Sequence, residues 1–340
     1  MSHVEHALGL DLGGANLKAA HSGGGAISVP FPLWKQPADL PAVLRHLVHG
    51  SFSPAPPPGV LAVTMTGELC DCFASKRQGV LAILDAVEAA AEGVPVQVWQ
   101  TDGRFVDLAA ARAAPLRAAA ANWLALACFA GRYAPRGPAL LLDVGSTTAD
   151  IVPLLDGRPV PRGRTDPERL RCSELVYTGV RRTPLCALLG GDVAAELFAT
   201  TLDAYLVLGW VAEDPQDRNT ADGRPATRAA AHARLARMLC ADLETSTEAD
   251  RRRLAERVNH RQMDLLTTAV ADVASRLPGP PRTVVLAGEG DFLGLRAVRE
   301  QQKFPPCPIV PLGKDLGAEV SRAACAHALA VLAVEQGVGG

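Results

Sequence analysis

Short apolar runs and longer helical patterns alternate along this chain. Four runs have the length and the β-branched content of buried strands, at residues 60–66, 94–99, 139–144 and 282–288. Apolar residues also recur at helical spacing, three and four positions apart, around residues 80–87 and 266–277. Two further apolar stretches, 113–130 and 317–336, predict helices as well. Strands and helices that alternate in both halves predict an α/β fold.

One phrase occurs twice, as LGLDLGGANLKAAH at 8–21 and as LLLDVGSTTADIV at 140–152. In both copies an apolar strand ends at an aspartate, Asp11 or Asp143, and a glycine follows two residues later. Strand-like sequence resumes after each turn, whereas a dinucleotide fingerprint or a P-loop runs from its glycines into a helix. Each copy therefore predicts a strand–turn–strand hairpin.

The two predicted turns have the chemistry of a phosphate site. Glycine lets the backbone approach an anion closely, and successive N–H groups form a concave nest for it. An aspartate at the end of such a strand can hold Mg²⁺ beside the phosphate, usually through water, so Asp11 and Asp143 are the candidate metal ligands. Two plain β-hairpins are the alternative. The candidate phosphate-binding residues are Gly13, Gly14, Ala15, Asn16, Lys18, Gly145, Ser146, Thr147 and Thr148.

Two further features are a third glycine-rich turn and a proline-rich segment that marks a domain boundary. Gly288 and Gly290 follow the last predicted strand, where ligands bind in open α/β sheets, and they predict a turn that binds nucleotide or substrate. The proline-rich segment 134–138 precedes the second hairpin and divides the chain into domains 1–138 and 139–340. We expect a ligand-binding cleft between the domains, and the C-terminal helix is a candidate to pack on the first domain.

Composition bounds the environment and the partners. The 340 residues include 34 basic and 36 acidic side chains, a net charge of −2, so we expect neither nucleic acid nor a membrane surface as partner. Eight cysteines follow no disulfide-scaffold or zinc-ligand spacing, and the first residues lack the pattern of a signal peptide. The sequence predicts a cytoplasmic two-domain protein and leaves its oligomeric state open.

The two hairpins and the late glycine turn resemble, in this order, the sugar kinase–heat-shock ATPase–actin superfamily. The stretches DLGGANLKAA, VTMTGELCDCF, LLLDVGSTTADIVP and YTGVRRTP are most similar to its hydantoinase/oxoprolinase-like branch. Within that branch they resemble proteins linked to tetrahydromethanopterin-dependent one-carbon metabolism. The resemblance implies a two-domain actin-like ATPase fold, ribonuclease H-like in each half, with an interdomain cleft. It also implies Mg²⁺ and, for the ATP-dependent members, ATP.

That family includes an archaeal transferase of methanofuran biosynthesis. It joins an aminomethylfuran-methyl diphosphate to the phenol of γ-glutamyltyramine and releases diphosphate, so the resemblance implies small-molecule diphosphate and phenolic substrates. Many sugar kinases place a hydroxyl residue directly after the Gly–Gly pair, where this chain has Ala15, and this departure weakens a kinase interpretation. The alternative is an ATP-dependent kinase, or an ATP-coupled enzyme of the hydantoinase or oxoprolinase type.

A phenol nucleophile with a pKa of about 10 needs a carboxylate in reach to take its proton. The candidate catalytic residues are Glu68, Asp102 and Asp150. The candidate substrate-binding residues are Thr66, Arg182, Asp222 and Arg224. The arginines suit a substrate carboxylate such as a glutamyl group. Turn formation, capping or a place on the solvated surface is the alternative role for these carboxylates and arginines.

Overall fold

The first half of the chain folds around a six-stranded sheet. The computed structural model describes residues 5–52, 55–302 and 304–337. The strands are β1 (Ala7–Leu12), β2 (Asn16–His21), β3 (Ala26–Pro30), β4 (Val60–Met65), β5 (Val96–Trp99) and β6 (Phe105–Val106). Their order in the sheet is β3-β2-β1-β4-β5-β6. β1 runs antiparallel to β2 and parallel to β4, so the first predicted hairpin lies at the centre of this sheet.

The second half repeats this topology. Its strands are β7 (Pro138–Val144), β8 (Ala149–Leu155), β9 (Arg158–Pro159), β10 (Leu175–Val176), β11 (Thr283–Ala287) and β12 (Ile309–Pro311). Their order is β10-β8-β7-β11-β12, with β9 paired to β8. β7 is antiparallel to β8 and parallel to β11, as β1 is to β2 and β4. The repeated phrase therefore forms the central hairpin of two equivalent sheets, and the predicted α/β class is confirmed.

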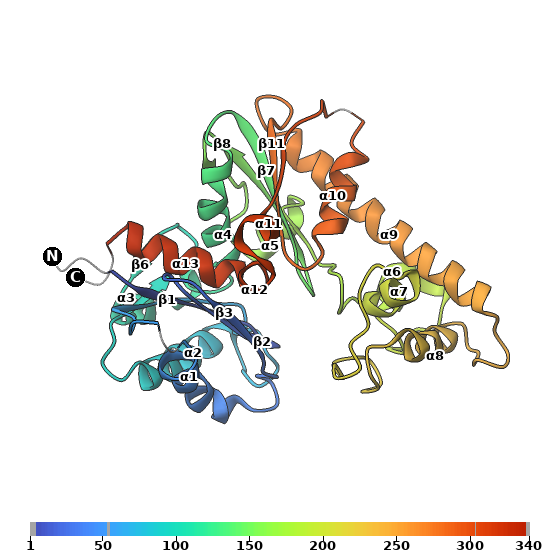
Figure 1. Cartoon of the computed structure of the whole chain (residues 1–340), viewed down its shortest axis with the longest axis horizontal. Helices are drawn as coiled ribbons and strands as arrows, with labels where there is room; N and C mark the ends of the chain where they lie inside the picture. Colours follow the sequence, from blue (N-terminus) through green and yellow to red (C-terminus); the bar gives the residue numbers. More distant parts are fainter. Residues whose placement is uncertain (1–4, 53–54, 303, 338–340) are drawn as a thin grey trace.

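Helices cover both sheets and extend beyond the second one (Figure 1). The helices of the first half are α1 (Leu40–His49), α2 (Lys76–Ala91), α3 (Leu108–Ala113) and α4 (Asn122–Ala130). Those of the second half are α5 (Asp166–Arg171), α6 (Leu185–Leu189), α7 (Thr201–Leu208), α8 (Arg228–Met238), α9 (Glu248–Ala274), α10 (Asp291–Arg299), α11 (Leu312–Leu316), α12 (Ala318–Arg322) and α13 (Ala324–Glu335). Short 3-10 helices occupy Pro37–Asp39, Pro115–Arg117, Gly131–Tyr133 and Gly190–Asp192.

The prediction of one helix over residues 113–130 was wrong. α3 ends just before Pro115, which opens a short 3-10 helix, and Ala120 adopts a left-handed φ of 48° before α4 begins. The residue before a proline is driven out of the α region, so a helix ends there readily. The predicted helix at 317–336 is likewise divided, at Ala323, into α12 and α13.

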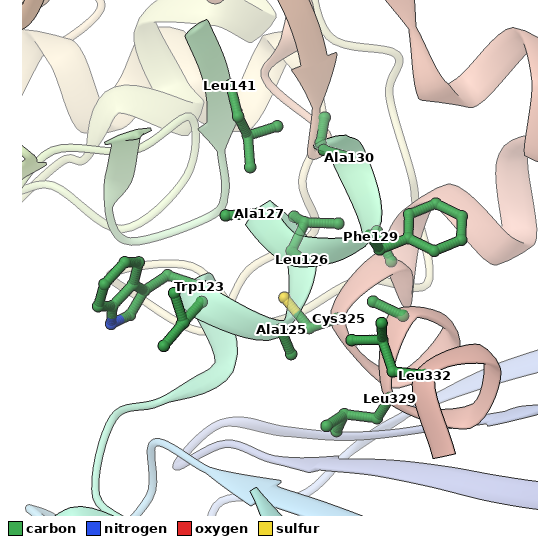
Figure 2. Close-up of a cluster of buried hydrophobic side chains, with 14 of the residues drawn as sticks. Trp123, Ala125, Leu126, Ala127, Phe129, Ala130, Leu141, Cys325, Leu329 and Leu332 are labelled. Carbon is green, nitrogen blue, oxygen red and sulfur yellow. The ribbon is translucent and has the colours of Figure 1, made fainter. Parts of the chain in front are cut away.

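α4 and α13 form an apolar layer that joins the two sheets. α13 packs on β1, β2 and β4 and alongside α4, and Figure 2 shows Leu329 and Leu332 of α13 near Leu126 of α4. The same buried cluster includes Val60 from the first sheet and Leu141 from the second. Because this helix pair is apolar on nearly every side, it is buried between both halves of the chain.

A helical lobe extends from the second sheet. α6, α7 and α8 pack against the N-terminal half of α9, and Figure 1 shows them far from the first sheet. The lobe has its own buried core, with Leu202, Leu235 and Leu254. The C-terminal half of α9 returns to the core of the second sheet through Leu266 and Val270. α9 therefore contributes to both cores and connects the lobe to the sheet.

A cavity of about 750 Å³ opens at the end of the second sheet where the central strand β7 begins. Arg136, Arg282 and Cys307 line it together with several prolines, among them Pro138, the first residue of β7. Asp143 lies at the other end of the same strand. The cavity is therefore separate from the predicted phosphate turns. No helix in the described residues is long and apolar enough to cross a membrane.

Candidate functional site

The first hairpin places an acidic and a basic side chain side by side. Asp11 on β1 pairs with Lys18 on β2 in the strand register. The turn between them is closed by the Gly13 N–H, which donates to the Asn16 carbonyl at 3.0 Å. Asp11 is buried, yet its Oδ1 atom has no hydrogen-bond partner in the part of the chain that the structure describes. A buried polar atom of this kind calls for a partner from a ligand or from water.

The second hairpin has the same turn geometry. The Gly145 N–H donates to the Thr148 carbonyl at 2.9 Å, in the position of the corresponding bond in the first hairpin. Asp143 pairs with Asp150 in the register of β7 and β8, so Asp150 occupies the place that Lys18 has in the first copy. The two copies thus share one backbone arrangement but differ in the charge that faces the first aspartate.

A segment within the stretch YTGVRRTP, residues 177–184, supports the second turn. The N–H groups of Arg181 and Arg182 both donate to the Ser146 carbonyl, at 3.1 and 2.9 Å. A Cβ on Gly179 would lie only 2.5 Å from backbone atoms of Ser146 and Thr147. No larger residue fits at this position without a shift of the backbone. Gly179 therefore allows this segment to hold the turn in place.

The third glycine turn contacts the second hairpin directly. The Gly290 N–H donates to the Val144 carbonyl at 2.8 Å. Gly288 adopts a left-handed φ of 84°, and a Cβ there would lie 2.6 Å from Oδ1 of Asp143. Glycine is required at this position both by the backbone conformation and by the close carboxylate. The structure therefore brings the predicted turn against a predicted metal ligand, with Glu289 between the two glycines.

Charged groups from both domains meet at these turns. Burial raises the pKa of Asp11, and burial together with repulsion by Asp150 and Asp11 raises the pKa of Asp143 to about 7. Burial disfavours the Lys18 ammonium, but the carboxylates of Asp11, Asp143 and Glu289 outweigh it and raise its pKa. Glu289 remains exposed, while the surrounding protein raises its pKa too. Lys18 is thus a protonated cation among acids of both domains.

A buried arginine orients Asp150. Arg169 of α5 forms an ion pair with the Asp150 carboxylate at 2.8 Å and donates to the Glu174 carbonyl at 2.9 Å. Its guanidinium stacks on the Trp123 ring, 3.9 Å from the ring centroid. Burial still raises the pKa of Asp150, against the attraction of Arg169. The carboxylate is therefore held in one orientation beside the second turn.

Glu68 follows β4 in a loop that abuts the first turn. A Cβ on the preceding Gly67 would lie 3.2 Å from the backbone nitrogen of Gly14. The Glu68 side chain is 1% exposed, and its Oε1 atom lies 3.5 Å from Nζ of Lys76, which is also 3.9 Å from Asp166 of the second domain. Burial raises the pKa of Glu68 to about 7, against the attraction of Lys76. A carboxyl that titrates near neutrality suits proton transfer.

Two of the candidate substrate residues border this site. Thr66 is exposed at the end of β4, and its N–H donates to the Leu12 carbonyl of β1 at 3.0 Å. Arg182 is exposed, with its guanidinium 5.6 Å from the centroid of the Trp34 ring in the first domain. The neighbouring Leu33 N–H donates to the first turn at 2.9 Å. Arg182 therefore extends from the second turn toward a segment attached to the first.

The other three candidates lie in turns or loops of their own. Asp102 is exposed in the turn between β5 and β6. Asp222 lies in the loop before α8, where its carboxylate accepts from Arg234 at 3.0 Å, and Arg224 beside it is exposed. Arg234 in turn forms a buried ion pair with Asp203 at 2.7 Å. These positions favour a turn role for Asp102 and a stabilising role in the lobe for Asp222, and among the described residues no hydrogen bond or ion pair joins the three to the predicted phosphate turns.

Sequence reasoning missed Lys76, Asp166, Arg169 and Glu289. Glu289 had a signal, its position between the two glycines of the third turn. The other three belong to neither copy of the repeated phrase and begin or lie within the helices α2 and α5. Only the packing of α2 and α5 brings them to the site.

Comparisons with known proteins identify relatives that cover most of this chain. Residues 60–301 match the Hydantoinase/oxoprolinase family. A γ-glutamylaminoethyl-phenoxymethyl-furanyl methanamine synthase of Methanocaldococcus jannaschii is 31% identical over 340 residues, which cover 97% of this chain and 98% of that protein. A protein of the same name from Methanococcus vannielii is 31% identical over 201 residues, which cover 57% of this chain and 89% of that protein.

A solved structure shares the fold. The nucleotide-free structure of acetone carboxylase, an enzyme of ATP-dependent acetone carboxylation, aligns with a TM-score of 0.57 at 11% identity and covers 97% of this chain and 70% of that chain. With the two equivalent sheets, this likeness confirms the expected two-domain actin-like fold. By the extent of the family match and of the methanogen relative, the chain belongs to the hydantoinase/oxoprolinase family.

Proposed function

We propose that this chain is a transferase of methanofuran-type cofactor biosynthesis. It joins an aminomethylfuran-methyl diphosphate to the phenol of a γ-glutamyltyramine-type acceptor and releases diphosphate. The observation that carries the proposal is 31% identity over 97% of the chain to a protein named as synthase of a compound with this phenoxymethyl-furan bond. The two phosphate turns and the buried carboxylates of the site supply the chemistry that such a bond requires.

The paired turns suit a diphosphate leaving group. When the bond between the furan methylene carbon and the diphosphate oxygen breaks, its electron pair stays on that oxygen, so negative charge builds there. The Lys18 ammonium and the N–H groups of the two turns can stabilise this charge, because preorganised donors act strongly where water is excluded. The raised pKa keeps Lys18 protonated at neutral pH.

The acceptor needs a base. As the phenol oxygen forms its bond to the methylene carbon, its proton must leave, and Glu68 is the candidate to take it. Its pKa of about 7 makes it a far better base than a solvated carboxylate while leaving much of it ionised at neutral pH. Asp150 is the second candidate, but its ion pair with Arg169 stabilises the charged form and weakens it as a base.

The residues also fit a hydrated Mg²⁺. This ion keeps several waters and uses one or two protein carboxylates, and Asp11, with its unpartnered Oδ1 atom, and Asp143 would hold it. Within the described residues no group of three His, Cys, Asp or Glu side chains is arranged as a closed metal site. When bound, Mg²⁺ would neutralise charge on the diphosphate.

The test is product formation without ATP. The protein is incubated with Mg²⁺, the aminomethylfuran diphosphate and γ-glutamyltyramine, and diphosphate release and the mass of the product are followed. We expect diphosphate release that requires both substrates. Glu68→Gln should lower kcat by about 10²–10⁴-fold with little change in KM for the furan diphosphate, because only the proton acceptor is lost.

Glu256→Gln is the matched control, since Glu256 is a half-exposed glutamate of α9 in the lobe; it should retain wild-type rates. The proposal fails if no ether forms without ATP, but ADP or phosphate appears once ATP and an acceptor are supplied. The chain would then be an ATP-coupled enzyme of the same family.

A further inference from the structure

The surroundings of Glu68 contain two charged residues that the proposed chemistry leaves unexplained. Lys76 is the first residue of α2, in the first domain, and Asp166 is the first residue of α5, in the second. The Lys76 ammonium lies 3.5 Å from the Glu68 carboxylate and 3.9 Å from the Asp166 carboxylate. One lysine therefore links the candidate base to an acid across the domain boundary.

Two residues near the start of α2 destabilise the helix but allow this contact. A cation at a helix N-terminus opposes the helix dipole, and α2 has no acidic residue in its first turn to offset Lys76. One turn further on, a Cβ at Gly79 would lie 2.2 Å from the Glu68 carbonyl oxygen. Glycine inside a helix is itself destabilising. The lysine at the helix start and the glycine inside the helix together bring Lys76 and the Glu68 loop into contact.

Only one oxygen of the Glu68 carboxylate is engaged. Lys76 lies beside Oε1, whereas Oε2 is buried and has no hydrogen-bond partner among the residues that the structure describes. The charged groups facing this carboxylate are Lys76 from α2 and Asp166 from α5. On its own loop, Cys70 is the titratable neighbour, and burial raises the pKa of its thiol, which keeps it neutral. Oε2 is thus the atom left for a substrate proton.

We propose that Lys76 is a positioning residue that sets the protonation of Glu68, and that Asp166 couples this setting to the position of the second domain. The inference rests on the proposed function, in which Glu68 takes the phenol proton. With the domains together, Asp166 shares the lysine and repels the Glu68 carboxylate, so Glu68 is the stronger base. With Asp166 withdrawn, Lys76 acts on Glu68 alone and weakens it.

The first test is the pH dependence of kcat in three variants. Lys76→Met should move the acidic limb of the profile upward by about one pH unit, because a cation within ~4–6 Å lowers a carboxyl pKa by one unit or more. Lys76→Arg keeps the charge and should stay near the wild type. Asp166→Asn removes the competing charge and should move the limb downward. A purely structural role would not give shifts of opposite sign.

The second test needs no turnover. The Glu68 carboxyl is titrated by ¹³C NMR in glutamate-labelled protein and assigned by the loss of its signal in Glu68→Gln. The proposal predicts the same order of midpoints, Asp166→Asn below wild type and Lys76→Met above it. Equal midpoints, or shifts of both variants in one direction, would overturn it. If the wild type forms no ether, the proposed function fails, while this titration still decides the role of Lys76.

Discussion

Single residues at this site are arranged at the expense of stability. Folding brings Asp143 close to Asp150 and Asp11, and its pKa rises to about 7 because burial and this repulsion disfavour the charged form. Lys18 compensates only in part, since it is shared among several acids. Natural proteins break local rules of this kind mainly where function requires it. We propose that these carboxylates are ligands for a cation that accompanies the substrate.

Replacing Asp143 by asparagine should stabilise the protein at alkaline pH and abolish ether formation. The folded pKa of about 7 lies above the ordinary 3.8, so the folded state binds this proton more tightly than the unfolded state. The contribution is present below the ordinary pKa and is lost as the pH rises through the folded pKa. The variant has no such loss.

Between about pH 5 and about pH 8, we expect the Tm of the wild type to fall more than that of the variant. Each kcal/mol of repulsion should lower the Tm by roughly 2–4 °C. Scanning calorimetry without divalent cations measures this difference. Parallel Tm curves for the two proteins would show that the Asp143 carboxylate is not under strain.

At the scale of elements, the central hairpins could be predicted and their supports could not. Asp, Gly and flanking apolar residues specify a strand–turn–strand unit locally, so β1–β2 and β7–β8 appear where the repeated phrase lies. The contacts that hold the second turn come from residues 179–182. The sequence marks this stretch as part of a family motif and Arg182 as a substrate ligand, but no local pattern predicts its contact with the turn. The dipeptide Asp222–Gly223 marks a turn in any context, and only packing shows that Asp222 pairs with Arg234. The break at Pro115 has a local cause, because a proline drives the residue before it out of the α region.

Gly179→Ala tests whether this support matters. A Cβ at this position would meet the Ser146 backbone at 2.5 Å, so the segment must move away from the turn. We expect product formation to fall by about 10²-fold, the cost of a misplacement near 1 Å at a reacting centre. Gly191→Ala is the control, because a Cβ at this position would point into open space. This substitution should leave the rate unchanged. Equal rates in both variants would remove residues 179–182 from the account.

At the scale of the whole molecule, the fold brings two similar turns to one place. The two sheets have equivalent strand orders, and the apolar layer of α4 and α13 joins them. The turns at the ends of β1 and β7 then share one set of interacting charges, Lys18 from the first half with Asp143 and Glu289 from the second. We propose that the repeated phrase thereby forms two halves of one anion site, which a single hairpin could not provide.

The most direct test of this claim is the binding of inorganic diphosphate with Mg²⁺, measured by isothermal titration calorimetry. We compare the wild type with Lys18→Met in the first hairpin, with the double variant Ser146→Ala/Thr147→Ala in the second, and with Lys314→Met, an exposed lysine of α11, as control. We expect one diphosphate site per chain. Its affinity should fall by about tenfold or more in both hairpin variants, as expected when a charged hydrogen bond or several hydrogen bonds are lost. The affinity of the control should be unchanged. Two independent sites, or an affinity that responds to only one hairpin, would contradict it.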